Sequence, residues 1–278
     1  MAANALRDAQ EQRGLVFAAI GRCSGKLLKV SLVVVLSLEV LLMCGCSANN
    51  EGTIGSASEE ITTKTVTPNY WNYVALGDSL AVGTGASYEG YVDRYAAYIE
   101  DDTGAQVSIT NLGRNGQTSS ELLYALRNDP SWRRAVGEAD VLTVNIGIND
   151  LGHAAEAYEN GTCSGTGNQD CLPEAVQTVE DNWNAIVAEL LGLRSTTSTI
   201  IRSAGLGYTP HFDTEEALKP YLDEVNGRIE KIARENGIPY IEAYLDRGHI
   251  SQDGLHPNDE GYEVIAERLR ELGYTPLA

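Results

Sequence analysis

Basic side chains are scarce in this sequence, and their scarcity excludes one class of partner. Among 278 residues there are 20 Lys plus Arg against 39 Asp plus Glu, which gives a formal net charge of -19 at pH 7. A protein that binds nucleic acid needs a basic surface to neutralise phosphates, so we expect no nucleic-acid partner. The acidity does not indicate disorder, because hydrophobic residues make up 43% and charged residues 21% of the chain, near the globular average.

The main apolar run is too short to cross a bilayer as a helix, which takes about 20 residues. This run, residues 30–43, has fourteen residues, of which eleven are apolar and only Glu39 is charged. Lys26 and Lys29 precede it, and a basic start followed by a short apolar run is the pattern of an export signal. We therefore expect the protein to be exported.

A cysteine follows this apolar run, in the sequence LMCGCS at residues 42–47. The small residue Gly45 directly before Cys46 resembles the lipobox of bacterial lipoproteins, in which the cysteine becomes the lipid-bearing first residue of the mature chain. The resemblance implies that residues 1–45 are a signal peptide and that lipid on Cys46 anchors the exported protein to the bacterial cell membrane. Two alternatives are an ordinary signal peptide and an uncleaved anchor. Residues 46–69 are rich in Ser, Thr, Gly, Asn and Glu, which is typical of a flexible tether.

Cysteine is also rare, with five residues in the whole chain. Removal of the signal and lipidation of Cys46 would leave only Cys163 and Cys171. Neither belongs to a Cys-x-x-Cys motif or has a close His partner, so we expect no metal site there. In an oxidising compartment two such cysteines are expected to form a disulfide that closes a small surface loop, and the alternative is two free thiols.

Short apolar runs alternate with segments of helical periodicity from Tyr70 onward. The runs predict strands at residues 71–76, 107–110, 141–146 and 199–202, and the stretch 237–241 leads into a fifth. Apolar residues at helical spacing predict helices between 91 and 104 and at 173–193, 218–236 and 259–272, and the capping-box form of residues 118–121 predicts that another helix begins there. Strands that alternate with helices indicate βαβ units, and hence an α/β fold with a mostly parallel sheet covered on both faces. We expect one such domain, at residues 70–278.

Polar clusters follow four of the predicted strands. They are GDSL at 77–80, NGQ at 115–117, GIND at 147–150 and DGLH at 253–256. Because ligands bind at the carboxyl ends of parallel strands, we expect these clusters to lie together. A serine, a histidine and a carboxylate that meet in space form an activated-hydroxyl nucleophile.

The four clusters, in this order, resemble the blocks that name the SGNH, or GDSL, family of serine esterases and lipases. The resemblance covers nearly the whole predicted domain and implies a flavodoxin-like three-layer α/β/α sandwich with a five-stranded parallel sheet. It implies that Ser79 is the nucleophile, His256 the general base and Asp253 the residue that orients the histidine. It also implies an oxyanion hole made by the backbone N–H groups of Ser79 and Gly116 and the side-chain amide of Asn149.

The function implied by the resemblance is hydrolysis of carboxylic esters without metal or cofactor, as in an esterase, a lipase or a lysophospholipase. One alternative is a carbohydrate O-acetyl esterase of the cell envelope. Another is a non-catalytic envelope lipoprotein that binds a glycan or a partner. The expected substrate is a small-molecule, lipid or acylated-glycan ester. Membrane contact is expected through the lipid anchor alone, with the protein acting as a monomer.

The residues themselves agree with these roles and also permit simpler ones. Asp253 lies three positions before His256, so one turn can bring its carboxylate to the imidazole. Ser79 alone is equally typical of a helix cap, and Asn149 with Asp150 of a turn.

Three further features bear on the site. The chain contains no Gly-x-Ser-x-Gly, which argues against the nucleophile elbow of the α/β-hydrolases. Gly113 lies close to Gly116, and either could be a turn glycine. The segments 153–171 and 205–213 follow the third and fourth predicted strands, where loops could shape a pocket.

Overall fold

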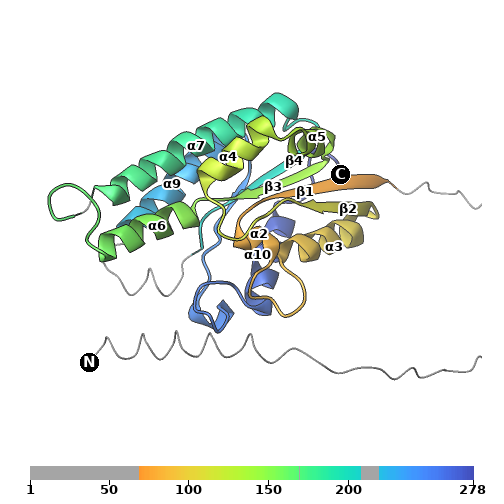
Figure 1. The fold of residues 1–278 in the computed structure, drawn as a ribbon. Helices are drawn as coiled ribbons and strands as arrows, with labels where there is room; N and C mark the ends of the chain where they lie inside the picture. The colour runs from red at the N-terminus through yellow and green to blue at the C-terminus, as the bar shows by residue number, and fades with distance from the viewer. Residues whose placement is uncertain (1–68, 169, 208–218) are drawn as a thin grey trace, which may run out of the picture. The chain divides into compact units, whose positions relative to one another are not determined.

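Five parallel strands form one sheet, in the order β2-β1-β3-β4-β5 (Figure 1). The strands are β1 (Tyr70–Gly77), β2 (Gln106–Asn111), β3 (Val141–Asn145), β4 (Ile200–Ala204) and β5 (Tyr240–Ile241). β3 lies at the centre of the sheet and all of its residues are buried, as expected of a strand covered on both faces. In the register Leu142 of β3 lies between Val74 of β1 and Ile201 of β4. The predicted α/β fold with a five-stranded parallel sheet is confirmed.

The computed structural model describes residues 69–168, 170–207 and 219–278. The predicted signal peptide, Cys46 and all but the last residue of the predicted tether lie outside these residues. Within the described ranges no helix has the length and apolar character needed to cross a membrane. In the same ranges no three His, Cys, Asp or Glu side chains are grouped so that they could hold a metal ion.

Helices cover both faces of the sheet and make three layers (Figure 1). One face is covered by α4 (Ser119–Asn128), α5 (Pro130–Glu138), α6 (Ile148–Glu159), α7 (Cys171–Leu193) and α9 (Lys219–Glu235). The other face is covered by α2 (Ser79–Val82), α3 (Tyr91–Thr103) and α10 (Asp259–Glu271), with the short 3-10 helix η2 (Arg247–His249) before α10. Each face has its own buried apolar cluster, with Trp183 in the first and Tyr262 in the second. Burial of these clusters is the main force that holds the layers together.

Two helices differ from the sequence-based expectation. α5 was not expected, because its core-facing stripe is short and consists mainly of Trp132 and Val136. Its start nevertheless carries a recognisable signal, since Asp129 caps the helix and Pro130 occupies its first turn. The segment 153–171 was expected to be a loop, but its first part belongs to α6.

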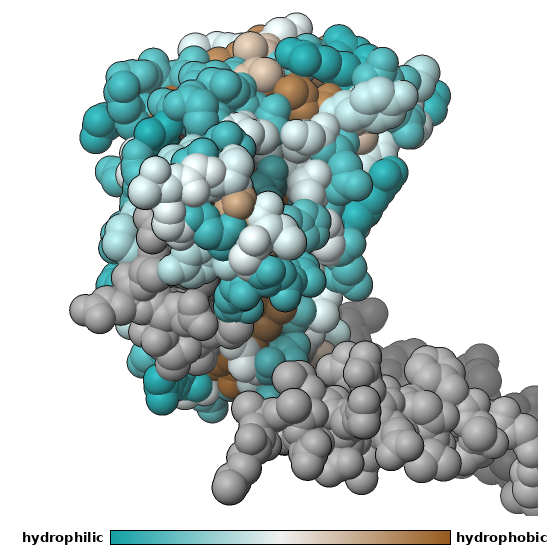
Figure 2. All heavy atoms as spheres, turned by 60° about the vertical axis from the view of Figure 1, so that its left-hand side comes forward, coloured by the Kyte–Doolittle hydropathy of each residue, from teal (hydrophilic) through white to brown (hydrophobic). Residues whose placement is uncertain are grey.

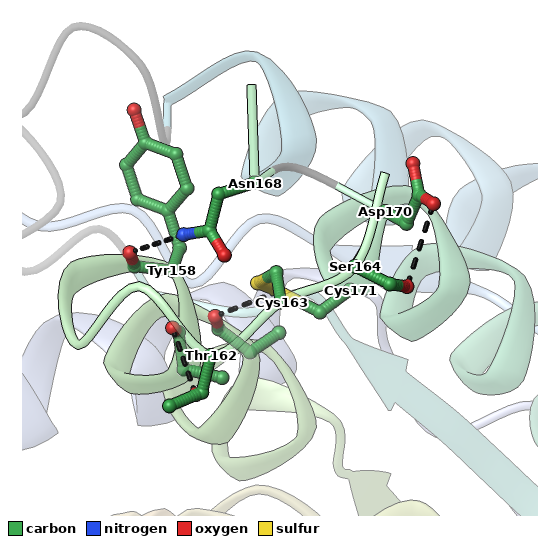
Figure 3. The surroundings of a disulfide bond; sticks show 9 residues. Tyr158, Thr162, Cys163, Ser164, Asn168, Asp170 and Cys171 are labelled. Carbon is green, nitrogen blue, oxygen red and sulfur yellow. Dashed lines mark hydrogen bonds between the residues drawn. A yellow bond between two sulfur atoms is a disulfide. The ribbon is translucent and has the colours of Figure 1, made fainter. Parts of the chain in front are cut away.

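A disulfide joins Cys163 to Cys171, between the end of α6 and the start of α7 (Figure 3). The Cα atoms of the two cysteines are 5.3 Å apart, and the sulfur of Cys171 lies 3.2 Å from the backbone oxygen of Ala154 in α6. In the same loop Asn168 Nδ2 donates a hydrogen bond to the backbone oxygen of Tyr158, 2.8 Å away. The bridge and this hydrogen bond hold the loop against α6.

Candidate active site

The turn that carries Ser79 begins with a glycine that no other residue can replace without strain. Gly77, the last residue of β1, has a φ of +152°, and a Cβ at this position would collide with the backbone oxygen of Asn145. Asp78 follows and caps α2, because its Oδ1 accepts a hydrogen bond from the backbone N–H of Leu80 at 3.0 Å. Ser79 is therefore the first residue of α2 and not its cap. Its hydroxyl lies at the carboxyl end of β1.

Ser79 is in direct hydrogen-bond contact with His256. Ser79 Oγ lies 2.8 Å from His256 Nε2, and His256 Nδ1 lies 2.7 Å from Oδ2 of Asp253. The fold thus joins the three side chains in one chain of hydrogen bonds, although Ser79 and His256 are 177 positions apart. At these distances the imidazole can accept the serine proton on one nitrogen while the carboxylate holds the other.

The hairpin at residues 251–256 holds Asp253 in place. Its Oδ1 accepts hydrogen bonds from Ser251 Oγ at 2.8 Å and from the backbone N–H groups of Leu255 and His256, both at 2.9 Å. Burial opposes the charge on Asp253, but the hydrogen bonds from the His256 side chain and from the backbone outweigh it. The pKa of Asp253 is therefore held well below its usual value. The carboxylate stays ionised beside His256 at neutral pH.

Asn149 and Gly116 are potential oxyanion donors, because both line the cavity that also contains Ser79 and His256. Asn149 lies in the first turn of α6, and its Nδ2 donates a hydrogen bond to the backbone oxygen of Gln117 at 2.9 Å. An amide nitrogen carries two hydrogens, so this bond orients the group and leaves the second N–H for a ligand. Gly116, with a φ of +74°, lines the cavity beside Asn149. Gly113 instead packs against α2, where a Cβ would lie 2.8 Å from that of Ala81.

A hydrogen-bonded group that sequence reasoning missed holds the start of α6. Asp150 accepts hydrogen bonds from the backbone N–H and the hydroxyl of Ser119 in α4, at 2.8 and 2.7 Å. Asn182 of α7 in turn donates to Ser119 Oγ at 2.8 Å. Burial raises the pKa of Asp150 in spite of the bonds from Ser119. Because Asp150 directly follows Asn149, this group fixes where the Asn149 amide lies.

Asp78, next to Ser79, is fully buried. Its exposed fraction is 0%, and its Oδ2 has no hydrogen-bond partner among the residues that the structure describes. Burial raises the pKa of Asp78 to about 7, against the opposing effect of the hydrogen bond from Leu80. Burial and, to a lesser extent, the negative charge of Asp78 raise the pKa of Tyr91 in α3 and of Tyr262 in α10. The burial arises from packing of distant helices, so the GDSL motif alone does not reveal it.

A cavity of about 670 Å³ opens beside Ser79 and His256. Its apolar lining includes Leu80, Ile148, Ala155, Leu206, Leu245, Ile250 and Leu255. Of the two segments expected to shape a pocket, residues 155, 156 and 159 line the cavity from helix α6, and residues 206 and 207 line it after β4. Residues 208–213 of the second segment lie outside the described residues. The surface seen in Figure 2 is mostly hydrophilic, with apolar residues in small patches. The mainly apolar lining of the cavity suits the hydrocarbon part of a ligand.

A sequence model of the GDSL-like Lipase/Acylhydrolase family matches residues 75–264, from β1 to α10. The chain belongs to this family. Members of the GDSL family are ester hydrolases, so the protein is an enzyme of the esterase and lipase type. The match contains all four polar clusters described above.

Similar proteins support the family assignment. The spore germination lipase LipC of Bacillus licheniformis is 30% identical over 214 residues, which cover 74% of this chain and 97% of LipC. The crystal structure of the lipase Lip_vut3 from a goat rumen metagenome is 30% identical, with a TM-score of 0.67, over 75% of this chain and 100% of that one. Axe2, an acetylxylan esterase from Geobacillus stearothermophilus, shares the fold at 17% identity and a TM-score of 0.56, over 74% of this chain and 95% of Axe2.

Proposed function

We propose that this GDSL-family protein cleaves carboxylic esters through an acyl-enzyme on Ser79. The observation that carries the proposal is the chain of hydrogen bonds from Ser79 through His256 to Asp253, at 2.8 and 2.7 Å, beside the cavity. In the first step His256 Nε2 takes the hydroxyl proton as the Ser79 oxygen attacks the ester carbonyl. His256 then returns the proton to the leaving alcohol, and the acyl group stays bonded to Ser79.

Water completes the cycle by the same route. His256 takes a proton from water, the hydroxide attacks the acyl carbonyl, and the proton returns to Ser79 as the acid leaves. In both halves the carbonyl oxygen becomes negative. The backbone N–H groups of Ser79 and Gly116 and the second amide N–H of Asn149 would stabilise it, and each such donor is typically worth about 10²- to 10³-fold in rate.

Labelling with a fluorophosphonate probe tests the nucleophile. The wild-type protein should be labelled and Ser79→Ala should not. Ser108→Ala, on the edge strand β2, is the matched control and should be labelled like the wild type. Equal labelling of the Ser79 variant and the wild type would refute the proposal. Absence of labelling in all three, together with no hydrolysis across an ester panel, would favour a non-catalytic lipoprotein that binds a glycan or a partner.

The apolar lining of the cavity supports an acyl chain longer than acetyl as the group that enters it. A series of p-nitrophenyl esters of increasing chain length measures this preference. We expect kcat/KM to rise from acetyl to a longer acyl group, because each buried methylene adds favourable transfer free energy, about 0.8 kcal/mol. Activity confined to acetyl esters would instead identify a carbohydrate O-acetyl esterase.

We further propose that the enzyme is exported and anchored by lipid on Cys46. The basic start, the short apolar run and Gly45 before Cys46 support this proposal, and a disulfide between Cys163 and Cys171 suits an oxidising compartment. Mass spectrometry of the mature amino terminus should find diacylglycerol on Cys46, and Cys46→Ala should abolish the modification. An unmodified terminus at another residue would refute the anchor.

A further inference from the structure

The two backbone donors of the proposed oxyanion hole come from separate segments of the chain. Ser79 is the first residue of α2, whereas Gly116 lies in the loop of residues 112–118 between β2 and α4. To act together, both N–H groups must reach the same oxygen atom, at about 2.7 to 3.1 Å. A contact that joins α2 to this loop therefore determines how well the two donors are aligned.

Thr84 joins the two segments. Its backbone N–H donates a hydrogen bond to the backbone oxygen of Ser79 at 3.0 Å. Its hydroxyl donates a hydrogen bond to Oδ1 of Asn115, the residue directly before Gly116, at 2.7 Å. Thr84 and Asn115 both line the cavity beside Ser79. One residue thus connects the nucleophile turn to the neighbour of the second backbone donor.

The segment that carries His256 holds the backbone of Thr84 in place. The hydroxyl of Tyr262, a fully buried residue of α10, donates a hydrogen bond to the backbone oxygen of Thr84 at 2.7 Å. The next residue, Gly85, has a φ of +96°, and a Cβ there would lie 2.8 Å from that of His256. Because the backbone is fixed on this side, the Thr84 hydroxyl can hold the loop in one position.

The middle of the loop has little else to hold it. On either side of it, the backbone N–H of Arg114 donates a hydrogen bond to β1 at 3.0 Å, and the backbone oxygen of Gln117 accepts one from α6 at 2.9 Å. Between them, the bond from Thr84 is the only hydrogen bond of Asn115 and Gly116 to the described residues. Packing does not replace it, because a Cβ at Gly116 would meet no atom within 4 Å.

We propose that Thr84 is a positioning residue for the oxyanion hole, and that its hydroxyl acts through Asn115 to align the N–H of Gly116 with that of Ser79. The proposal rests on the proposed ester hydrolysis at Ser79. The carbonyl oxygen becomes negative only as the tetrahedral intermediate forms, so the alignment matters most in the transition state. Loss of the Thr84 hydroxyl therefore lowers kcat and leaves KM nearly unchanged.

Thr84→Val tests the proposal, because it removes the hydroxyl at similar volume. The variant should lower kcat by about tenfold and change KM by less than about twofold. A trifluoromethyl ketone, which forms a tetrahedral adduct with a serine, should bind more weakly by about the same factor as kcat falls. Thr84→Ser keeps the hydroxyl and should restore most of the wild-type kcat. Thr178→Val is the matched control, since Thr178 is an exposed threonine of α7 whose hydroxyl bonds to the backbone oxygen of Glu174 at 2.8 Å.

Replacement of the acceptor tests the same hydrogen bond from the other side. Asn115→Leu should lower kcat by a factor similar to that of Thr84→Val. The double variant should lose less than about twofold more than either single variant, because each change breaks the same bond. Losses that multiply in the double variant would show that the two side chains act separately, which contradicts the proposal.

The outcomes separate the positioning role from the proposed function. Fluorophosphonate labelling of the wild type with an unchanged kcat for Thr84→Val overturns the positioning role alone. A raised KM at constant kcat also overturns it, because the hydroxyl then binds the ground-state ester. Equal losses for Thr84→Val and Thr84→Ser exclude the hydroxyl as the cause. If Thr84→Val does not fold, wild-type kcat for Asn115→Leu overturns the role. A wild-type protein that neither labels nor hydrolyses esters overturns both proposals.

Discussion

His249 Nδ1 lies 2.7 Å from Oδ1 of Asp246, the same distance that separates His256 Nδ1 from Oδ2 of Asp253. In both pairs the aspartate stands three positions before the histidine. Only the second pair continues to the proposed nucleophile, because His256 Nε2 contacts Ser79 Oγ at 2.8 Å, whereas neither member of the first pair lines the cavity beside Ser79. The Asp-x-x-His pattern is therefore a local structural unit. Its chemistry depends on what the fold brings to the other imidazole nitrogen.

The two Asp–His pairs give a controlled test of catalysis. Asp253→Asn should lower kcat by about 10²- to 10⁴-fold at neutral pH, because the imidazole loses both its orientation and the charge that stabilises its protonated form. KM should change much less. Asp246→Asn alters the matched pair and should leave kcat within a factor of about two. Steady-state kinetics on one ester measures both, and similar losses in the two variants would contradict the assigned role of Asp253.

Replacement of Asn149 tests the proposed oxyanion hole. Asn149→Ala removes the side-chain donor and should lower kcat by about 10²- to 10³-fold with little change in KM, because the interaction strengthens only as the oxyanion forms. Asn184→Ala is the control, since Asn184 is an exposed asparagine of α7 whose Nδ2 donates a hydrogen bond to the backbone oxygen of Glu180 in the same helix. A rise in KM at constant kcat for Asn149→Ala would show that the amide binds the ground state instead.

Gly152 of α6 gives access to the length of the acyl chain. It lines the cavity, and a Cβ built on it meets no atom within 4 Å, so a larger side chain would occupy cavity space. Gly152→Leu should lower kcat/KM for long acyl esters by about tenfold or more relative to acetyl esters. Gly192→Leu, at an exposed position of α7 with equally open space, should not change the chain-length profile. A uniform change across all chain lengths would place the acyl group elsewhere.

The stability of the protein should depend on pH through Asp78. Burial raises its pKa from an ordinary 3.8 to about 7 in the folded state. Between these values the folded state binds more protons than the unfolded state, so this residue makes the free energy of unfolding fall as the pH rises from about 4 to about 7. Asp78→Asn removes the titrating group and keeps an oxygen for the N–H of Leu80. The variant should therefore gain stability over the wild type with rising pH, by at most about 4 kcal/mol.

Urea unfolding of wild type and Asp78→Asn from about pH 5 to about pH 8 measures this difference directly. Comparison of the two proteins at each pH cancels the contributions of titrating groups that do not interact with Asp78, whereas Asp150, whose charge raises the pKa of Asp78, remains part of the difference. Asp101→Asn, at an exposed position of α3, is the control and should show a constant offset. A pH-independent difference for Asp78→Asn would mean that the pKa of Asp78 is not raised in the folded state.

The sequence predicts those parts of the site whose signal is local. Ser79 and Asn149 stand in short motifs directly after strands, and the strands themselves are visible as apolar runs. The alternation of strands and helices predicts a parallel sheet. Because parallel strands end at one edge of the sheet, the motifs that follow them are predicted to lie close together. The order of the four clusters along the chain resembles that of the GDSL family, whose sequence model matches residues 75–264, and this resemblance predicts the remaining members of the site, Gly116, Asp253 and His256.

The features that the sequence does not predict depend on tertiary packing. The bonds between Asp150 and Ser119 join residues 31 positions apart, and no motif relates them. The buried states of Asp78 and Gln117 arise only when neighbouring helices and loops cover them. The helical state of residues 153–159 was missed for a similar reason, because the apolar stripe of α6 is small and is stabilised by contact with α7.

The order of elements along the chain also determines when the enzyme can become active during its synthesis. Asp253 and His256 lie between β5 and α10, in the last part of the domain to be made. A nascent or truncated chain that ends before Asp253 contains Ser79, Gly116 and Asn149 but lacks the proposed base, His256. Under the proposed mechanism such a chain cannot cleave esters, and activity begins only once residues 253–256 have been made and folded into place.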